Sequence, residues 1–174
     1  MRKRVFEPLG MISAGFGSPG HAGRVDQPWG HHPSGREIRP TRQDNAPAMG
    51  PAATVHCTVP DWAKFAAVHL RGSQGKPSLL KPATFRGLHT PPRGHDYAGG
   101  WLVGERSWAG GRTLSHNGSN TNWYAAIWMA PARDFAVLTA TNQGGAAGDK
   151  ATDQSASKLI ESVAFLTRQE SRKL

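Results

Sequence analysis

The chain has 174 residues, of which 37% are hydrophobic, and a formal net charge of +9. This length fits one domain or a piece of a larger one. The basic residues are spread along the chain, with no basic helix face and no basic stripe interleaved with aromatic residues, which argues against specific nucleic-acid binding.

Cysteine usage and apolar runs narrow the class further. Cys57 is the single cysteine, so no intrachain disulfide is available. The adjacent His56 lacks any Cys-x-x-Cys or His-x-x-x-His spacing, and we expect a small buried cysteine with no metal and no other cofactor. No apolar run approaches the ~18 residues of a membrane span. We also expect no signal peptide, because Glu7, Pro8 and Gly10 interrupt the region behind the basic start.

Residues 1–57 are predicted to be a loop-rich segment. The sequence has 21 glycines and 13 prolines, above the usual combined share of about 12%, and many of them fall here. Residues 18–51 show neither the strand period nor the helix period. This stretch contains three histidines and a tryptophan, His21, Trp29, His31 and His32. An irregular surface loop is favoured over a metal or ligand site, although so long a loop is uncommon unless it serves one.

Residues 58–92 are predicted to be helical. Thr58 is a good N-cap, and Asp61 three residues later resembles a capping box. An apolar stripe follows at helical spacing, formed by Trp62, Phe65, Ala66, His69 and Leu70. His69 on that stripe is expected to pack rather than to catalyse, Gly72 is expected to end the helix, and residues 81–88 are expected to form a second, short helix.

Residues 97–142 are predicted to form an antiparallel sheet. We expect strands at 97–106 and 108–118, then a hairpin of 123–130 and 135–142 with its turn at 131–134. Both faces of the hairpin strands are apolar, so helices should cover both sides. A C-terminal helix is expected over 149–168, capped by Asp149. Its buried face should consist of Ala156, Leu159, Ile160, Val163 and Leu166.

The segment His116-Asn117-Gly118 is the most informative stretch. Gly118 has no side chain, so a substrate can approach the backbone closely. The N–H of Ser119 is then placed to face a developing oxyanion. His116 leaves the strand on the same side as Gly118 and can present a proton donor there. On spacing alone, a strand end where His116 and Asn117 make turn hydrogen bonds is the favoured explanation, because His-x-Gly is a weak motif.

The surrounding residues resemble a known family. The stretch 110–145 resembles the third conserved element of serine β-lactamase-related hydrolases, which include class C β-lactamases, penicillin-binding DD-peptidases and related esterases. In that family Lys-Thr-Gly or His-x-Gly on a strand is followed by two antiparallel strands, often ending in Thr-Asn, and a C-terminal helix. Thr141-Asn142 fits. The segments FEPLGM at 6–11, PDWAKFAAVHLRG at 60–72 and YAGGW at 97–101 extend the resemblance over nearly the whole chain.

The resemblance implies roles for individual residues. His116 would stabilise negative charge and assist proton transfer near a serine nucleophile, and Ser119 would give one oxyanion-hole N–H. Gly118 would be the obligatory small residue. Asn117 stands where Thr or Ser is commoner. Asn117, Gly118 and Asn120 are expected to contact the substrate.

The family's nucleophile lies in Ser-x-x-Lys, far N-terminal to these residues, and is followed by Tyr-x-Asn. No Tyr-x-Asn string exists in the sequence. Ser-x-x-Lys occurs at Ser78–Lys81, inside a connecting segment, and at Ser155–Lys158, on the exposed side of the terminal helix, and neither is expected to be the nucleophile.

The sequence therefore predicts an α+β fold, the C-terminal portion of a β-lactamase/transpeptidase-like domain over residues 1–174. The expected function is a fragment of a serine hydrolase acting on a small ester, β-lactam or peptide amide, inactive alone. The alternatives are a non-catalytic binding module or half of a split enzyme that pairs with an N-terminal half chain, and less favourably a basic nucleic-acid binder. Localisation is left open.

Overall fold

The computed structural model describes residues 1–21, 23–24, 26–34 and 37–170, with side chains as far as Val163. The chain divides into two compact units. The first consists of residues 1–66, 117–125 and 140–152, and the second of residues 67–116, 126–139 and 153 onward. Strands β7, β8 and β9 and helices α1 and α3 each contribute residues to both units.

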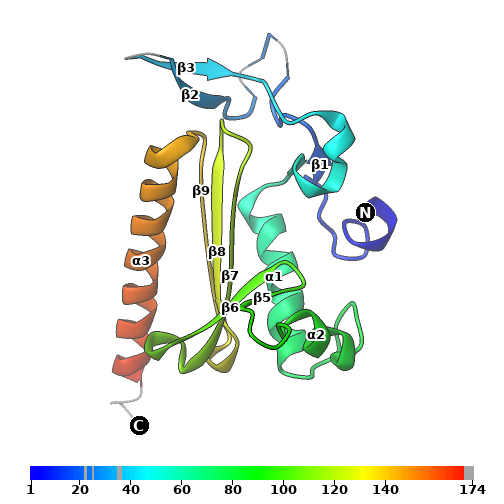
Figure 1. Ribbon diagram of the computed structural model, residues 1–174, viewed down its shortest axis with the longest axis vertical. Helices are drawn as coiled ribbons and strands as arrows, with labels where there is room; N and C mark the ends of the chain where they lie inside the picture. Colours follow the sequence, from blue (N-terminus) through cyan, green and yellow to red (C-terminus); the bar gives the residue numbers. More distant parts are fainter. Residues whose placement is uncertain (22, 25, 35–36, 171–174) are drawn as a thin grey trace. The chain divides into compact units, whose positions relative to one another are not determined.

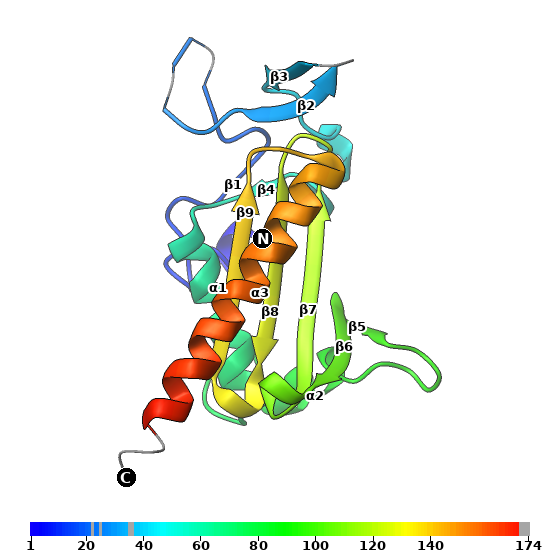
Figure 2. The same cartoon turned by 90° about the vertical axis from the view of Figure 1, so that its left-hand side faces the viewer.

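A five-stranded sheet is the main element, with its strands in chain order. The strands are β5 (Tyr97–Ala98), β6 (Trp101–Arg106), β7 (Gly111–Ser119), β8 (Tyr124–Ala130) and β9 (Phe135–Thr141). Figure 2 shows β7, β8 and β9 side by side. The predicted hairpin is present as β8 and β9, and its connection is the 3-10 turn Pro131–Arg133 followed by Asp134 in the left-handed region, at φ 54°.

The strand predicted at 97–106 is in fact a hairpin of two strands. Gly99 and Gly100 have φ values of 53° and 91°, which L side chains rarely adopt, and they turn the chain between β5 and β6. The two strands pair antiparallel, with Tyr97 opposite Leu102. The prediction was wrong because two glycines within an apolar run were read as part of the strand.

The second unit has the expected layers. In this unit α3 (Gly145–Glu170, here from residue 153) lies on one side of the strands (Figure 1). The end of α1 (Val59–Ser73, here from residue 67) and α2 (Pro82–Leu88) lie on the other side. The core of the unit is built from large side chains that are fully buried, Phe85, Leu114 and Met129.

Helix α1 matches the prediction in extent but not in detail. Gly72 lies inside the helix rather than beyond its end, and a Cβ there would overlap the Phe85 ring, so glycine is needed for close packing. The predicted capping box does not close. Asp61 instead accepts hydrogen bonds from the N–H and hydroxyl of Ser13, at 2.7 and 2.5 Å, and Lys64 Nζ lies 2.6 Å away. Thr58 still caps the helix, because its Oγ1 accepts from the N–H of Asp61 at 3.4 Å.

The hydroxyl and N–H of Ser13 together with the ammonium group of Lys64 stabilise the charged form of Asp61. The ammonium makes the largest contribution, and the pKa of Asp61 falls to about 2. This carboxylate therefore joins the N-terminal segment to the start of α1 within the first unit.

The first unit is loop-rich but contains short strands. The 3-10 turn η1 (Arg2–Arg4) opens the chain, and β1 (Gly15–Phe16) pairs with β4 (Val55–His56). A hairpin of β2 (Gly30–Ser34) and β3 (Glu37–Thr41) lies within the stretch predicted to be irregular, followed by η2 (Pro47–Ala52). The hairpin escaped prediction because it carries Pro33 and Pro40 and no apolar alternation, so its pairing comes from the backbone. A small core of Phe6, Met11 and Ala14 anchors the N-terminal segment.

The C-terminal helix begins earlier than predicted. It starts at Gly145, so Asp149 lies inside α3 and does not cap it. Of the predicted buried face, Ala156 is buried and Ile160 and Val163 are half-buried, but Leu159 is 47% exposed and that assignment was wrong. The side chain of Leu166 lies outside the described residues. In the described part of the chain, no helix is both long and apolar enough to cross a membrane.

Candidate active site

The C-terminal end of β7 changes abruptly from buried to exposed. Thr113, Leu114 and Ser115 are buried, whereas residues 116–119 are exposed. The pairing of β6 with β7 ends at Leu102 opposite Ser115. Beyond Ser115, the described strand pairs therefore give β7 no β6 neighbour, and its backbone groups on that side are available to a ligand.

His116 is the first exposed residue on this end of β7. Its Nε2 lies 3.1 Å from the Tyr97 hydroxyl, and the two rings are 6.0 Å apart. Tyr97 is itself 48% exposed. No role was predicted for Tyr97, because its position beside His116 depends on the Gly99-Gly100 turn. The sequence itself showed only a tyrosine at the start of a predicted strand, which does not indicate a site residue.

Gly118 has open space in front of it. A Cβ built at this position would meet no heavy atom within 4 Å, in contrast to Gly72 or Gly30, where packing requires glycine. The fold itself therefore does not demand a glycine at position 118.

Asn117 and Tyr124 are joined across the start of the β7–β8 hairpin. The Asn117 amide donates to the Tyr124 hydroxyl at 2.7 Å. This bond orients the exposed Asn117 side chain and holds it against β8. In the family that the sequence resembles, Thr or Ser is commoner at this position.

Ser119 and Asn120 build the turn after β7. The Ser119 hydroxyl donates to the carbonyl oxygen of Trp123 at 2.7 Å and accepts from the N–H of Thr121 at 3.0 Å. The Asn120 Oδ1 accepts from the N–H groups of Asn122 and Trp123, and its Nδ2 donates to Asp44 at 2.7 Å. Both side chains thus have structural partners.

Neither Ser78 nor Ser155 has the environment of a nucleophile. The Ser78 hydroxyl donates to the carbonyl oxygen of Val68 at 3.0 Å. Ser155 is exposed on α3, and Lys158, which the motif would use, lies 2.8 Å from Glu161.

The sequence also contains a third Ser-x-x-Lys string, Ser73 to Lys76. Ser73 is the last residue of α1, so Lys76 does not follow one helical turn later as the motif requires. The Ser73 hydroxyl lies 2.8 Å from the carbonyl oxygen of His69 and 3.1 Å from His89 Nδ1. His69 Nδ1 and His89 Nε2 are 2.9 Å apart.

One proton arrangement satisfies every member of this histidine cluster, defined as His69, Ser73 and His89. His69 donates to His89, His89 donates to the Ser73 hydroxyl, and Ser73 donates to the His69 carbonyl oxygen. Burial, followed by the neighbouring charge of His89, lowers the pKa of His69 to about 4. Burial, followed by the charge of Arg112, lowers that of His89 to about 4. The cluster is therefore a neutral packing network, as expected for His69.

Three further histidines and the cysteine make local contacts. His21 Nδ1 lies 2.6 Å from Asp26, and His31 Nδ1 lies 3.1 Å from the carbonyl oxygen of Asn142. His56 Nδ1 donates to the Gly17 carbonyl oxygen at 2.7 Å. Burial, and secondarily the charge of Asp61, raises the pKa of the half-buried Cys57 thiol. Across the described residues, no three histidine, cysteine or carboxylate groups lie close enough together to hold a metal ion.

Comparison with solved structures shows the fold. A similar fold is found in an octameric penicillin-binding protein homologue from Pyrococcus abyssi, with a TM-score of 0.63, 18% identity and 81% of this chain covered. A structure described as that of SurE gives a TM-score of 0.68 at 17% identity, with 91% of this chain covered. The chain spans 32% and 38% of the lengths of these two proteins. No curated protein matches the sequence.

The family model called Beta-lactamase matches residues 1–161. The chain therefore belongs to the Beta-lactamase family, and the resemblance stated from its sequence motifs is confirmed.

Proposed function

We propose that this chain supplies the substrate-side strand of an acyl-serine hydrolase site and does not catalyse turnover alone. The intact reaction is the hydrolysis of an ester, a β-lactam or a peptide amide through an acyl-serine intermediate. In this proposal His116 stabilises negative charge and assists proton transfer, and the Ser119 N–H is one oxyanion-hole donor. Gly118 leaves room for the substrate, and Asn117 contacts it.

The exposed end of β7 carries the proposal. It combines a histidine, an open approach at Gly118 and backbone groups without a β6 neighbour within a few residues of one strand. Ser119 and Asn120 hold the following turn in place through their side chains. In the proposed site the backbone N–H of Ser119, rather than its hydroxyl, contacts the oxyanion.

The missing nucleophile explains why we expect no activity from the chain alone. Ser73 ends α1, the Ser78 hydroxyl donates to the carbonyl oxygen of Val68, and Lys158, one helical turn after the exposed Ser155, pairs with Glu161. Loss of a nucleophile and its base together typically costs on the order of 10⁶ in kcat. Proximity and the oxyanion donor cannot replace the acyl-enzyme step.

The direct test is turnover and serine labelling of the purified chain. We expect no burst and no turnover with a chromogenic cephalosporin or a nitrophenyl ester, and no stoichiometric labelling by a fluorophosphonate. Stoichiometric labelling at Ser73, Ser78 or Ser155, abolished by the matching serine-to-alanine variant, would overturn the proposal.

The role of His116 has its own test. Any polypeptide encoded just upstream that contains Ser-x-x-Lys and then Tyr-x-Asn is co-expressed with this chain. We expect the pair to gain turnover and to lose it with His116→Ala, while Leu159→Ala on the exposed face of α3 leaves it intact. Equal turnover by the wild-type and His116→Ala pairs would exclude the proposed role of His116.

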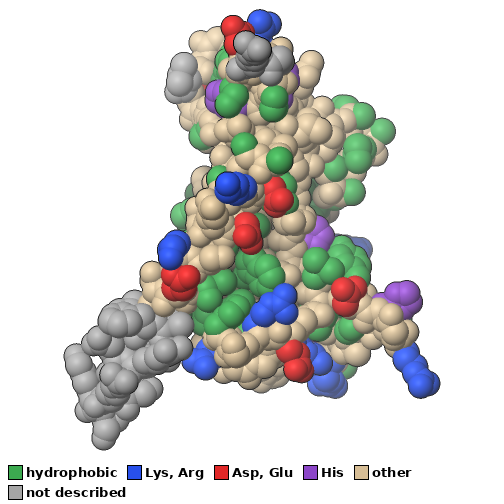
Figure 3. All heavy atoms as spheres, turned by 60° about the vertical axis from the view of Figure 1, so that its left-hand side comes forward, with side chains coloured by type: hydrophobic (Ala, Val, Ile, Leu, Met, Phe, Trp, Pro, Cys, Tyr) green, Lys and Arg blue, Asp and Glu red, His purple; other side chains and the backbone are tan. Residues whose placement is uncertain are grey.

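A second candidate is a non-catalytic module that binds a partner polypeptide. The observation that favours it is the exposure of large apolar side chains in the first unit, among them Ile12 at 95% and Val59 at 47%. Lysine and arginine side chains, in contrast, are scattered on the face shown in Figure 3 rather than gathered into one patch. A partner-dependent rise in melting temperature without any gain of turnover would support this candidate.

A further inference from the structure

The imidazole of His116 has a partner for one of its two nitrogens. Its Nε2 lies 3.1 Å from the Tyr97 hydroxyl, which is within hydrogen-bond distance. Among the described residues, no hydrogen bond is made to its Nδ1. Because the His116 side chain is exposed, Nδ1 is open to solvent or to a ligand. The contact that Tyr97 makes with Nε2 therefore decides what the open nitrogen can offer.

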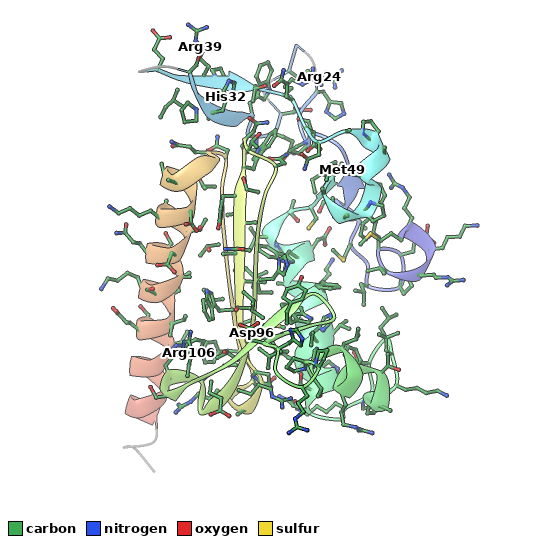
Figure 4. The ribbon with its side chains drawn as sticks, viewed as in Figure 1. Arg24, His32, Arg39, Met49, Asp96 and Arg106 are labelled. Carbon is green, nitrogen blue, oxygen red and sulfur yellow. The ribbon has the colours of Figure 1, made fainter. Side chains whose placement is uncertain are left out.

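The backbone that carries Tyr97 is held in place on both sides. Figure 4 labels Asp96, the residue before β5, whose carbonyl oxygen accepts from the N–H of Val103 at 2.7 Å. Ala98, the residue after Tyr97, is buried and pairs with the buried Trp101 of β6. The two neighbours of Tyr97 thus fix the strand, although Tyr97 itself faces solvent.

The turn of the β5–β6 hairpin adds a second anchor. Gly99 has a positive φ, and a Cβ there would overlap the carbonyl oxygen of Leu88, so only glycine fits this close approach. The Trp101 ring packs against the His69 ring, with centroids 4.9 Å apart. The hairpin therefore presents Tyr97 from a fixed frame within the second unit, which lowers the entropic cost of orienting another side chain.

Packing does not account for a tyrosine at position 97. The side chain is 48% exposed, and the buried side of β5 is supplied by Ala98. Within the described residues, the hydrogen bond and the ring contact of Tyr97 are both made to His116. Removal of the hydroxyl would leave the hairpin intact and would change only the surroundings of His116.

The direction of this hydrogen bond follows from the chemistry of the two groups. A phenol O–H is a more acidic donor than a neutral imidazole N–H, and the proton-free nitrogen of imidazole is a stronger acceptor than a phenol oxygen. We therefore expect the Tyr97 hydroxyl to donate to His116 Nε2. A neutral imidazole carries one N–H, so a proton-free Nε2 places that proton on Nδ1.

We infer that Tyr97 is a positioning residue for His116 in the acyl-transfer site. Its hydroxyl keeps the imidazole proton on Nδ1, so that His116 meets negative charge on the substrate as a neutral N–H donor of fixed orientation. This inference rests on the proposed function, because it takes the exposed end of β7 as the place where substrate binds. It gives the β5–β6 hairpin a part in the site.

The tautomer of His116 can be measured on the chain alone. The histidines are labelled with nitrogen-15, and long-range proton–nitrogen correlation spectra are recorded at pH 8, where an ordinary imidazole is neutral. The signals of His116 are those lost in His116→Gln. We expect the Nδ1–H form to dominate in the wild type. Tyr97→Phe should shift the ratio of the two forms toward Nε2–H by about fivefold or more, because one hydrogen bond is lost.

Tyr124→Phe is the matched control. It removes the other tyrosine hydroxyl of the chain, which accepts from the side chain of Asn117, next to His116 in the sequence. We expect this variant to leave the tautomer ratio of His116 unchanged. The signals of the buried His69 and His89 should be the same in both variants and in the wild type, which shows that the fold is intact.

A dominant Nε2–H form in the wild type would overturn the inference, since His116 would then donate to Tyr97. An unchanged ratio in Tyr97→Phe, or an equal shift in Tyr124→Phe, would overturn it as well. In the co-expressed pair described above, Tyr97→Phe should lower kcat by about tenfold and leave KM within about twofold, and an unchanged kcat would also contradict the inference.

The two proposals fail in different ways. The tautomer of His116 is measured without a nucleophile, so it decides on the role of Tyr97 whether or not the pair turns over substrate. Absence of turnover by the pair, or serine labelling of the isolated chain, would count against the proposed function alone.

Discussion

The histidine cluster and the exposed end of β7 present histidines in opposite settings. His69 and His89 are 7% and 3% exposed, and the hydrogen bonds of His89 are all made inside the protein. His116 is exposed and meets a single tyrosine hydroxyl. A serine next to two histidines looks more like catalytic machinery than a lone His-x-Gly string does. A buried histidine such as His89, whose hydrogen bonds are made inside the protein, contributes to packing. An exposed histidine beside open space, such as His116, is available to a ligand.

The largest expected effect separates these two settings by stability. His89→Ala leaves a cavity beside Phe85 and removes the hydrogen-bond partner of His69 and Ser73. We expect it to lower the free energy of unfolding by about 2–4 kcal/mol. His116→Ala, as the matched control, should change it by less than about 0.5 kcal/mol. Urea unfolding measures both, and similar losses for the two variants would refute the distinction.

The second prediction uses acid. The pKa values of His69 and His89 lie at about 4 in the folded chain, below the ordinary value near 6.5. The unfolded chain therefore binds more protons between these values. The stability that the cluster contributes is complete above pH 6.5 and is lost as the pH falls toward 4.

We expect a loss on the order of 2 kcal/mol across this window, measured as the urea midpoint at several pH values. The His89→Gln variant should show a flatter dependence, because one of the two titrating rings is absent. A wild-type midpoint that does not change between pH 6.5 and 4.5 would contradict the neutral network.

The smallest expected effect concerns the turn after β7. Asn120→Ala removes the acceptor for two backbone N–H groups and the bond to Asp44, and should cost about 1 kcal/mol. Tyr97→Phe removes only an exposed hydroxyl next to His116 and should stay within about 0.5 kcal/mol. Thermal unfolding compares the two. A larger loss for Tyr97→Phe would mean that the Tyr97–His116 contact holds the fold rather than a site.

Periodicity predicted the elements that bury a face. Helix α1, with Ala66, His69 and Leu70 buried, and the β8–β9 hairpin both follow apolar patterns that a sequence displays directly. The β2–β3 hairpin could not be found in this way, since exposed residues and two prolines give no alternation. The start of α3 was missed because a glycine-rich segment was expected to be a loop.

The candidate site was only partly accessible from sequence. His116, Gly118 and Ser119 stand in one short string, so their proximity follows from the chain itself. Tyr97 comes from a distant segment, and its position beside His116 depends on the Gly99-Gly100 turn. A contact that depends on a turn type, with no apolar pattern to mark it, has no signal in a single sequence.

Two glycines, Gly30 at the start of β2 and Gly144 just before α3, limit how the hollow of about 480 Å³ beside Ser119 can change. A Cβ at Gly144 would overlap the backbone of Thr121, and a Cβ at Gly30 would overlap Asn122 and Trp123. Substitutions at these two positions would force the walls apart, so the frame of the hollow tolerates little variation. Any change in the shape of the hollow, whether by selection or in the laboratory, must therefore come from lining side chains such as His32, Gln43 and Tyr124.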